Sequence, residues 1–595
     1  MAEPVRLVIW DLDGTFWAGT LTEGGHTYID AHHNIVIELA KRGIVSAICS
    51  KNDFGIVKGI LEEKGIWDYF VFPSIDWTPK GQRLKQLIED VQLRPETVLL
   101  LDDNPINLRE AEHYVPGIQT ADDSVIPRLL ESPLLKGKDD AELSRLKQYK
   151  LLETKKTDQA VAEDNIDFLR CCDIRVTIEH DVEQNLDRAV ELINRTNQLN
   201  YTKNRLPEEL SAAKEQLLQE LSGFDIQAGL VRVTDRYGDY GYCGFYLTRT
   251  RRGQSRLEYF CFSCRILNMG IENWVYALLG RPAITVAGEV LSPLSDHADI
   301  DWIQLGSHDA QDEVRQNGVS APVVIIRGAC LVSPLVHYFQ TNAREVIGEF
   351  NFVRNRVAVR VDHSLMLRYA IEGVTPEQMA VFIRLGFKPK DFETAFVKTS
   401  EFAIRIVSTW VDTQNIIYRH RETGLLVPYK ARKMRKKLAE RAGDFEKAIQ
   451  SEEPGSAWEA YRYLQENFDW LGAMPEAEAD RTLDVILRAV PEGEPLFLAT
   501  ASEGSMEGGA LARATVFNKL IARAIARHPD RLVRQISFAQ FAEDDDMIAS
   551  THFPRKIYLR VYEEICAICD DLLRSRTHGK RGRTTATAEL AENLS

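Results

Sequence analysis

Several features that would mark a secreted, membrane-bound or nucleic-acid-binding protein are scarce or missing in this sequence. Only nine of the 595 residues are cysteine, and they are scattered, so a reducing cytoplasm fits better than a disulfide framework. No apolar run reaches the length of a membrane-spanning helix, and no signal peptide is visible before the first apolar strand. The net charge of -15 argues against a general nucleic-acid binder. We therefore expect a cytoplasmic protein with no membrane and no nucleic-acid partner.

The chain is too long for a single hydrophobic core. Hydrophobic residues make up 44% and charged residues 27% of it, which is ordinary for a globular protein, and the length predicts several domains. Strand-like and helix-like segments alternate, which predicts α/β domains. We predict a first domain over 1–135, a connecting helix over 136–171, a second domain over 172–305, a linker over 306–320, a third domain over 321–573 and a disordered tail over 574–595.

Two carboxylates at the end of the first apolar run are the most informative feature. Residues 5–10 are predicted to form a buried parallel strand, which ends at Asp11 and Asp13. Residues two apart on a strand share a face, so both acids can point into one site, and Gly14 allows the turn that follows. One carboxylate can then be a nucleophile and the other a general acid and base, with Mg²⁺ nearby. A strand that simply ends in an acidic turn is the alternative.

Three further polar groups follow apolar segments in the same region. Ser50, Lys51 and Asn52 follow the strand predicted over 44–49, Lys80 begins an amphipathic helix, and Asp102 and Asp103 follow the strand predicted over 97–101. The ordered set resembles the haloacid dehalogenase-like phosphotransferase superfamily, whose core is a Rossmann-like sheet. The resemblance implies that Asp11 is the nucleophile, that Asp13 is the acid and base, that Ser50, Lys51, Asn52 and Lys80 bind phosphate, and that Asp11, Asp13, Asp102 and Asp103 hold Mg²⁺. The segments between these motifs are too short for a cap domain.

Three stretches of the second domain make the resemblance more specific. They are 195–200, which ends a helix with amides, 235–241, a turn rich in Gly and Tyr, and 263–272, which leads from a strand into a helix. Together with the first domain, residues 5 to about 290 resemble the FkbH-like proteins of polyketide pathways, which join a phosphatase-like domain to an acetyltransferase-like domain. The resemblance implies transfer of the glyceryl group of 1,3-bisphosphoglycerate, a phosphorylated three-carbon metabolite, to the phosphopantetheine thiol of an acyl carrier protein, with loss of phosphate.

Cys264 is a candidate acyl acceptor in the second domain. A thiolate accepts acyl groups readily, and we expect a helix N-terminus together with Arg265 to lower the pKa of Cys264. A small buried structural cysteine is the alternative. Asn197, Gln198 and Arg265 are candidates for substrate binding, although the two amides could instead cap their helix. His180, Asp235 and Asp239 are alternative groups for activating a thiol, although Asp235 is better suited to order its turn with Arg236.

The third domain resembles a degenerate SGNH-type hydrolase or acyltransferase. Ala329 stands where the nucleophilic Ser of such a domain is expected, Cys330 follows it, and His552 lies late in the chain. Either Cys330 is a nucleophile with His552 as its base and Asn415 in the oxyanion hole, or the domain is an inactive binding platform. For the whole chain, the alternatives are a phosphatase of a phosphorylated metabolite or protein, with the other domains for recognition, and a scaffold that docks carrier proteins without catalysis.

Overall fold

A computed structural model gives the structure of the protein. It describes residues 3–23, 25–161, 165–251, 254–295, 300–306, 322–329, 331–354, 357–360, 363–397, 402–431, 456–501, 503, 508–542 and 553–570. Three separate sheets of five, six and five strands organise this part of the chain, and two of them are parallel. The predicted α/β fold class is therefore confirmed.

The first sheet has the strand order β5-β4-β1-β6-β7, and every pair in it is parallel. Its strands are β1 (Leu7–Trp10), β4 (Val45–Ser50), β5 (Ser74–Ile75), β6 (Val98–Leu101) and β7 (Gln119–Ala121). All residues of β1, β4 and β6 are buried, because helices cover both faces. Apolar side chains of α1 (Asp30–Lys41) and α2 (Phe54–Glu63) pack on one face, and those of α3 (Lys80–Asp90) and α4 (Pro105–Tyr114) on the other.

The second sheet is mainly antiparallel and has the order β13-β8-β10-β11-β12-β9. Its strands are β8 (Ile174–Glu179), β9 (Leu199–Asn200), β10 (Ile226–Asp235), β11 (Gly238–Arg251), β12 (Gln254–Phe262) and β13 (Ile303–Leu305). Helices α7 (Leu186–Arg195) and α8 (Leu210–Leu221) bury one face. Helices α6 (Asn165–Cys171) and α9 (Ile271–Leu278) bury the other. The segment predicted as one connecting helix contains two, α5 (Ser144–Val161) and α6.

The third sheet is again parallel, with the order β15-β14-β18-β23-β24. Its strands are β14 (Val323–Gly328), β15 (Glu345–Phe350), β18 (Ala403–Ser408), β23 (Leu496–Ala499) and β24 (Val533–Ile536). Helix α11 (Leu335–Phe339) and the last helix, 555–570, cover one face. Helices α12 (Ser364–Glu372), α16 (Glu476–Ala489) and α17 (Gly508–Arg527) cover the other.

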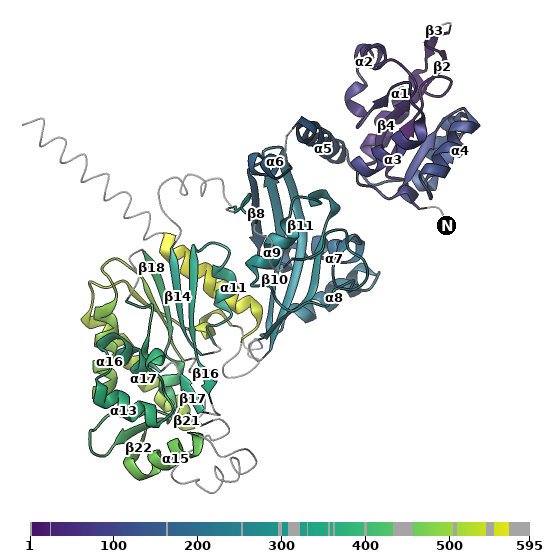
Figure 1. Cartoon of the computed structure of the whole chain (residues 1–595). Helices are drawn as coiled ribbons and strands as arrows, with labels where there is room; N and C mark the ends of the chain where they lie inside the picture. Colours follow the sequence, from purple (N-terminus) through teal and green to yellow (C-terminus); the bar gives the residue numbers. More distant parts are fainter. Residues whose placement is uncertain are drawn as a thin grey trace, which may run out of the picture.

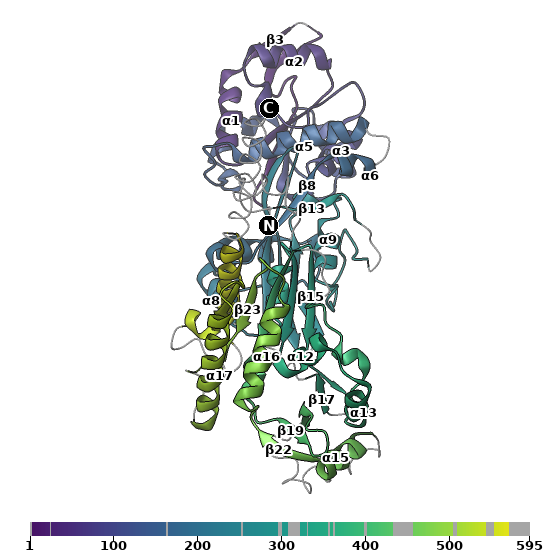
Figure 2. The ribbon, with the colours of Figure 1, turned by 90° about the vertical axis from the view of Figure 1, so that its left-hand side faces the viewer.

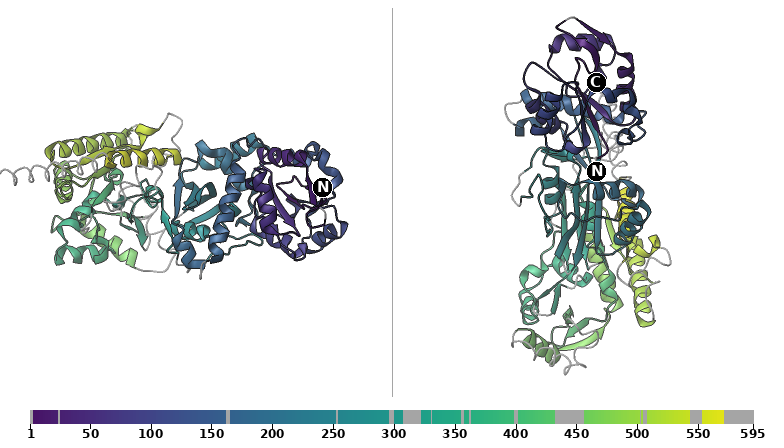
Figure 3. Two further views of the ribbon diagram at one scale, coloured as in Figure 1. Left: turned by 90° about the horizontal axis from the view of Figure 1, so that it is seen from above. Right: turned by 90° about the vertical axis from the view of Figure 1, so that its right-hand side faces the viewer.

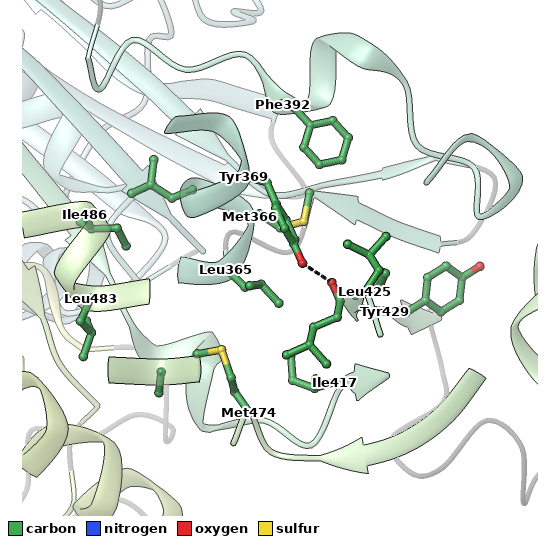
Figure 4. Close-up of a cluster of buried hydrophobic side chains, with 14 of the residues drawn as sticks. Leu365, Met366, Tyr369, Phe392, Ile417, Leu425, Tyr429, Met474, Leu483 and Ile486 are labelled. Atoms are coloured by element: carbon green, nitrogen blue, oxygen red, sulfur yellow. Dashed lines mark hydrogen bonds between the residues drawn. The ribbon is translucent and has the colours of Figure 1, made fainter. Parts of the chain in front are cut away.

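A second layer of small elements extends the third domain. The strands β19 (Ile417–His420), β20 (Leu426–Pro428) and β22 (Phe468–Gly472) form an antiparallel sheet beside α13 (Pro376–Arg384) and α15 (Ser456–Asn467). Figure 4 shows the apolar cluster between this sheet and α12, in which the hydroxyl of Tyr369 donates to the carbonyl of Leu426 at 2.8 Å. This contact ties α12 to β20.

The three domains lie in a row (Figure 1), and the view from above shows the second domain between the other two (Figure 3). Helix α5 joins the first two domains: Leu146 packs in the first core, and Lys155 lies 2.9 Å from Asp235 of the second domain. Buried Arg555 joins the second and third, because it donates to the carbonyl of His180 at 2.7 Å and pairs with Glu183. In Figure 2, α16 and α17 run side by side at the end far from the first domain, as their packing contacts also indicate. No helix among the described residues has the length and apolar character needed to cross a membrane.

Candidate active site

The polar side chains of the first domain meet where the order of its strands reverses. The strand β1 lies between β4 and β6, so the chain leaves β1 in one direction along the sheet and returns on the other side for β6. The carboxyl ends of strands at such a point form a crevice in open α/β sheets. Asp11 directly follows β1, and its backbone N–H donates to Leu101 at the end of β6 at 2.9 Å. The next residue after β6 is Asp102.

Asp11 is held by one hydroxyl and one ammonium group. Ser50 Oγ donates to Asp11 Oδ1 at 2.8 Å, and Lys80 Nζ lies 2.8 Å from the same oxygen. Among the described residues no hydrogen bond reaches the other oxygen, Oδ2. Lys80 is the first residue of α3, and its buried ammonium also lies 2.6 Å from Asp102 Oδ2. One cation therefore links the ends of β1 and β6.

Burial and pairing set the charges of this group. Burial lowers the pKa of Lys80, but the two neighbouring carboxylates raise it by more, so its pKa lies above the usual value and the ammonium stays charged. Burial also raises the pKa of Asp11, with the charge of Lys80 acting against it. The pKa of Asp103 is raised by burial and by the charge of Asp102. The acids outnumber the single buried cation, which favours a second positive charge at the site.

Three carboxylates offer ligands for such a cation. Oxygen atoms of Asp11, Asp102 and Asp103 all lie within 4.8 Å of one another. A Cβ atom at Gly14 would lie 2.5 Å from Asp103 Oδ2, so only glycine leaves this carboxylate its place. A set of carboxylate oxygens suits a hard cation such as Mg²⁺. The donor set of the first domain thus fits the expected metal.

Asp13 faces the same site but is bound differently. Its Oδ1 accepts from Trp17 Nε1 at 2.7 Å and from the backbone of Leu21 at 3.2 Å, and its Oδ2 accepts from Asn52 Nδ2 at 3.2 Å. The same Asn52 amide lies 3.2 Å from Ser50 Oγ, which ties both acids to one polar network. Asn52 Oδ1 is buried and has no hydrogen-bond partner among the described residues, so it is free for a ligand.

This geometry supports neither phosphate binding by Lys51 nor metal binding by Asp13. Lys51 is exposed, and Asp13 is not among the clustered metal-ligating carboxylates of the described chain. Their proposed roles in binding stay predictions.

Sequence reasoning missed the residues that position the site. Asn107 Nδ2 donates to both oxygens of Asp102, at 2.9 and 3.1 Å, and the Thr15 hydroxyl accepts from the backbone of Asp103 at 3.0 Å. Arg83 donates to the carbonyls of Ser50 and Ser74. The hairpin of β2 (Trp17–Thr20) and β3 (Gly25–Tyr28), beside the site, was also missed. Asn107 lies in the first turn of α4, five residues after Asp102. This spacing is the one signal for Asn107 that the sequence offered.

In the second domain the structure brings two of the predicted residues together. The Cys264 thiol donates to Gln198 Oε1 at 2.8 Å, although the two residues are 66 positions apart. The predicted lowering of the pKa of Cys264 is wrong: burial raises it, and the element at this position is a single 3-10 turn, Cys264–Ile266, with no long helix behind it. Arg265 is exposed and donates to the Tyr240 carbonyl at 3.4 Å, and Asn197 is exposed as well.

The alternative activating groups have other partners. His180 lies beyond the end of β8, three strands from β12, and its ring contacts Thr341 of the third domain at 3.1 Å. Asp235 does order its turn by accepting from the backbone of Tyr237 and Gly238, but its cation is Lys155 rather than Arg236. Asp239 pairs with Arg232.

Cys330 and His552, the predicted pair of the third domain, lie outside the described residues. Asn415 is exposed. At the carboxyl ends of β14 and β18, where this sheet reverses its order, the structure shows a buried group that the sequence analysis missed. The hydroxyl of Ser364 donates to Asp412, and His363 Nδ1 lies 3.1 Å from the same carboxylate. His363 Nε2 has no partner among the described residues.

Comparison with known proteins gave matches only among solved structures. No family model and no curated protein matches the chain. The N-terminal part of a Bacteroides fragilis protein, which contains a phosphatase domain and was solved with Mg, is 24% identical over 23% of this chain and 41% of that one, with a TM-score of 0.19. A putative 3-deoxy-D-manno-octulosonate 8-phosphate phosphatase from Vibrio cholerae is 22% identical over 19% of this chain and 64% of that one, with a TM-score of 0.16.

A third match covers nearly the whole length of the compared protein. The cobalt-bound deoxy-D-mannose-octulosonate 8-phosphate phosphatase from Haemophilus influenzae is 15% identical over 28% of this chain and 98% of that one, with a TM-score of 0.18. All three similarities concern a minor part of the chain. The chain spans less than two thirds of the first two proteins, and the activity of the whole chain has to be argued from its own residues.

Proposed function

We propose that the first domain is a Mg²⁺-dependent phosphatase of the haloacid dehalogenase type, with Asp11 as its nucleophile. The observation that carries this proposal is the arrangement around Asp11. Lys80 and Ser50 fix Asp11 Oδ1, and oxygen atoms of Asp11, Asp102 and Asp103 converge at the point where the sheet reverses. Two buried acids, Asp11 and Asp102, crowded against a third are costly unless a cation and a phosphoryl group use them.

Each residue then has a defined task in phosphoryl transfer. Asp11 Oδ2 forms a bond to phosphorus as the bond to the leaving oxygen breaks, and Asp13 supplies the proton that the leaving oxygen takes up. Asp13 then accepts a proton from the water that attacks the phosphoryl group, and phosphate and free Asp11 result. Lys80 supplies positive charge and donors to the phosphoryl oxygens, and Ser50 and Asn52 line the same site, where the Asn52 Nδ2 group holds Asp13 and Ser50 in place. Mg²⁺, held by Asp11, Asp102 and Asp103, would neutralise charge on the phosphoryl oxygens.

We further propose that the whole chain is a glyceryl transferase that loads an acyl carrier protein from 1,3-bisphosphoglycerate. Cys264 is the candidate carrier: its thiol sulfur forms a bond to the carbonyl carbon of the acyl phosphate, the carbon–oxygen bond to phosphate breaks, and the thiol proton leaves on the phosphate. The thioester then passes to the phosphopantetheine thiol. The Cys264–Gln198 hydrogen bond supports this role, since it fixes the thiol beside an amide that the resemblance places in the site.

The position of the two sites favours separate reactions over direct relay. Asp11 lies at the carboxyl end of β1, on the side of the β2–β3 hairpin, which Figure 1 shows at the end of the first domain far from the second. If Cys264 carries no acyl group, the chain is a phosphatase of a phosphorylated metabolite or protein, and the other domains serve recognition.

The test of the first proposal is phosphate release from p-nitrophenyl phosphate and from 1,3-bisphosphoglycerate with Mg²⁺. Asp11→Asn should abolish release without unfolding the protein, and the exposed Asp122→Asn of the same domain is the matched control. Phosphate release that persists in Asp11→Asn would rule out Asp11 as the nucleophile. The transfer proposal is tested by the intact mass of the protein after incubation with 1,3-bisphosphoglycerate. A glyceryl adduct lost in Cys264→Ala supports it, and the absence of an adduct in the parent protein favours the phosphatase alone.

A further inference from the structure

The two most exposed large apolar side chains of the described residues both stand beside the proposed phosphatase site. Trp77, in the loop between β5 and α3, is 62% exposed, and Ile106, in the first turn of α4, is 71% exposed. Single exposed apolar residues are ordinary on protein surfaces, but large apolar side chains that gather at a ligand site often belong to it. Each of the two is held in place by contacts with the catalytic group.

Trp77 is tied to the site from both sides along the chain. The backbone N–H of Asp76 donates to the Ser50 carbonyl at 3.3 Å, and the Ser50 hydroxyl donates to Asp11. On the other side, Lys80 lies 2.8 Å from Asp11. The carboxylate of Asp76 also accepts the backbone N–H two residues further on, at 2.7 Å, which closes the loop. The loop therefore keeps the indole of Trp77 in water at a fixed place near the nucleophile.

Ile106 is tied to the metal-binding carboxylates in the same way. Its backbone N–H donates to Asn104 Oδ1 at 2.9 Å, and the backbone N–H of Asn104 donates to Asp102 Oδ1 at 2.9 Å. The next residue, Asn107, donates to both oxygens of Asp102. The contacts that hold Asp102 thus also fix the exposed position of Ile106.

The two side chains belong to loops on opposite sides of the nucleophile. Trp77 follows β5 and Ile106 follows β6, and β4 and β1 lie between these strands, with Asp11 at the end of β1. Three strand spacings separate β5 from β6, or about 14 Å. In an in-line displacement the leaving oxygen lies on the side of phosphorus opposite the attacking Asp11 oxygen, and so toward the mouth between these loops.

We propose that Trp77 and Ile106 bind the leaving group of the phosphomonoester, and that this leaving group is an apolar chain or ring. The inference rests on the proposed phosphatase function and names the class of its substrate. Contact with an apolar leaving group would remove both side chains from water, whereas a short polar leaving group would leave them exposed. Trp77 and Ile106 then determine specificity, and they take no part in the transfer of the phosphoryl group.

The test is a series of n-alkyl phosphates, from ethyl to hexyl phosphate, with the full chain and Mg²⁺. The leaving oxygen has the same chemistry in every ester, so a change of kcat/KM along the series reports contact with the alkyl chain. A fully buried methylene gains about fourfold, and we expect roughly two- to fourfold for each methylene added. Glycerol 3-phosphate, which has little apolar surface, should react no faster than ethyl phosphate. A flat series in the parent protein would overturn the proposal and favour a protein partner for this face.

Two double variants make the comparison specific. Trp77→Ala with Ile106→Ala should lower kcat/KM for hexyl phosphate about tenfold and leave that for ethyl phosphate within about twofold of the parental value. Leu218→Ala with Ile383→Ala, which truncates exposed apolar side chains of the other two domains, should leave the whole series unchanged. A parental dependence on chain length in the first double variant would overturn the proposal. An equal loss for ethyl and hexyl phosphate would overturn it too, because it would indicate damage to the catalytic groups.

Failure of this inference can be told apart from failure of the phosphatase proposal. Phosphate release that Asp11→Asn abolishes but that does not rise with chain length would reject the inference alone. If no ester is hydrolysed, the phosphatase proposal fails, and calorimetric titration of the same esters with Mg²⁺ decides the inference. Affinity that rises with chain length in the parent and not in the Trp77→Ala, Ile106→Ala protein supports it. Affinity independent of chain length, or no binding, overturns it.

Discussion

Lys80 Nζ lies 2.8 Å from Asp11 Oδ1, and both side chains are buried. The ammonium also contacts Asp102, so it is the main compensation for two acids that the fold places at the ends of neighbouring strands. This relationship links the stability of the first domain to its proposed chemistry, and it gives the first prediction.

Lys80→Met should destabilise the protein and strongly slow phosphate release. Removing one partner of a buried pair leaves uncompensated charge and costs roughly 3–5 kcal/mol, and losing a donor to the transferred group costs on the order of 10²–10³ in kcat. Urea denaturation and phosphate release measure the two effects. Lys85→Met, exposed on the same helix, should change neither. A Lys80→Met protein with parental activity would contradict the assignment.

Asn107→Ala should weaken Mg²⁺ binding while the fold persists. Asn107 donates to both oxygens of Asp102, and loss of such a supporting bond typically lowers metal affinity about 10- to 100-fold. The affinity can be read from the shift of the melting temperature across a Mg²⁺ titration. Arg109→Gln, exposed on the same helix, should retain the parental affinity. Equal affinities in Asn107→Ala and the parent would show that Asn107 does not support metal binding through Asp102.

Gly14→Ala and Gly25→Ala form a matched pair. Both glycines have positive φ, +70° and +89°, so either substitution costs about 1–2 kcal/mol in backbone strain. Only at Gly14 would the new Cβ press on Asp103, since Gly25 has open space around it. Activity at saturating Mg²⁺ should therefore fall in Gly14→Ala alone. Equal losses in both variants would mean that backbone strain, not Asp103, accounts for the effect.

Asp412→Asn should become more stable relative to the parent as pH rises. Burial raises the pKa of Asp412 to about 7, so the folded state keeps its proton at pH values where the unfolded state has lost it. The parent therefore loses stability between about pH 4 and pH 7, by roughly 4 kcal/mol for a fully buried group. The pKa of His363 is lowered to about 3 by burial, and this contribution is common to both proteins. Urea denaturation across that range measures the difference, and a pH-independent difference would indicate a stable His363–Asp412 ion pair.

The sequence predicted the first site well because the functional residues of this site stand at the ends of strands. Asp11, Ser50 and Asp102 each come directly at or after an apolar run, and parallel strands bring such residues to one edge. Asn107 and Arg83 were missed because their partners depend on how α3 and α4 dock, which no local pattern records. In the second domain the sequence marked Cys264 and Gln198 separately, and the antiparallel pairing of β9 with β12 brings them into contact.

Burial was the hardest property to predict. The pKa of Cys264 was expected to fall because of a helix N-terminus and Arg265, yet Cys264 is half-buried and the effect of burial on its thiol exceeds the interactions that lower its pKa. The group of Ser364, His363 and Asp412 was missed for a related reason. Its members come from the beginning of α12 and the turn after β18, and only the packed third domain encloses them.

The central claim, that Asp11 is a phosphoryl acceptor, is tested most directly by trapping the phosphorylated enzyme. The protein would be mixed with p-nitrophenyl phosphate and Mg²⁺, quenched in acid within its first turnovers, digested with pepsin and analysed by mass spectrometry. We predict one added phosphoryl group on the peptide that contains Asp11, absent from Asp11→Asn and lost at alkaline pH, as expected of an acyl phosphate. Phosphate release at the parental rate with no phosphorylated Asp11 peptide, or with the phosphoryl group on another residue, would contradict the account.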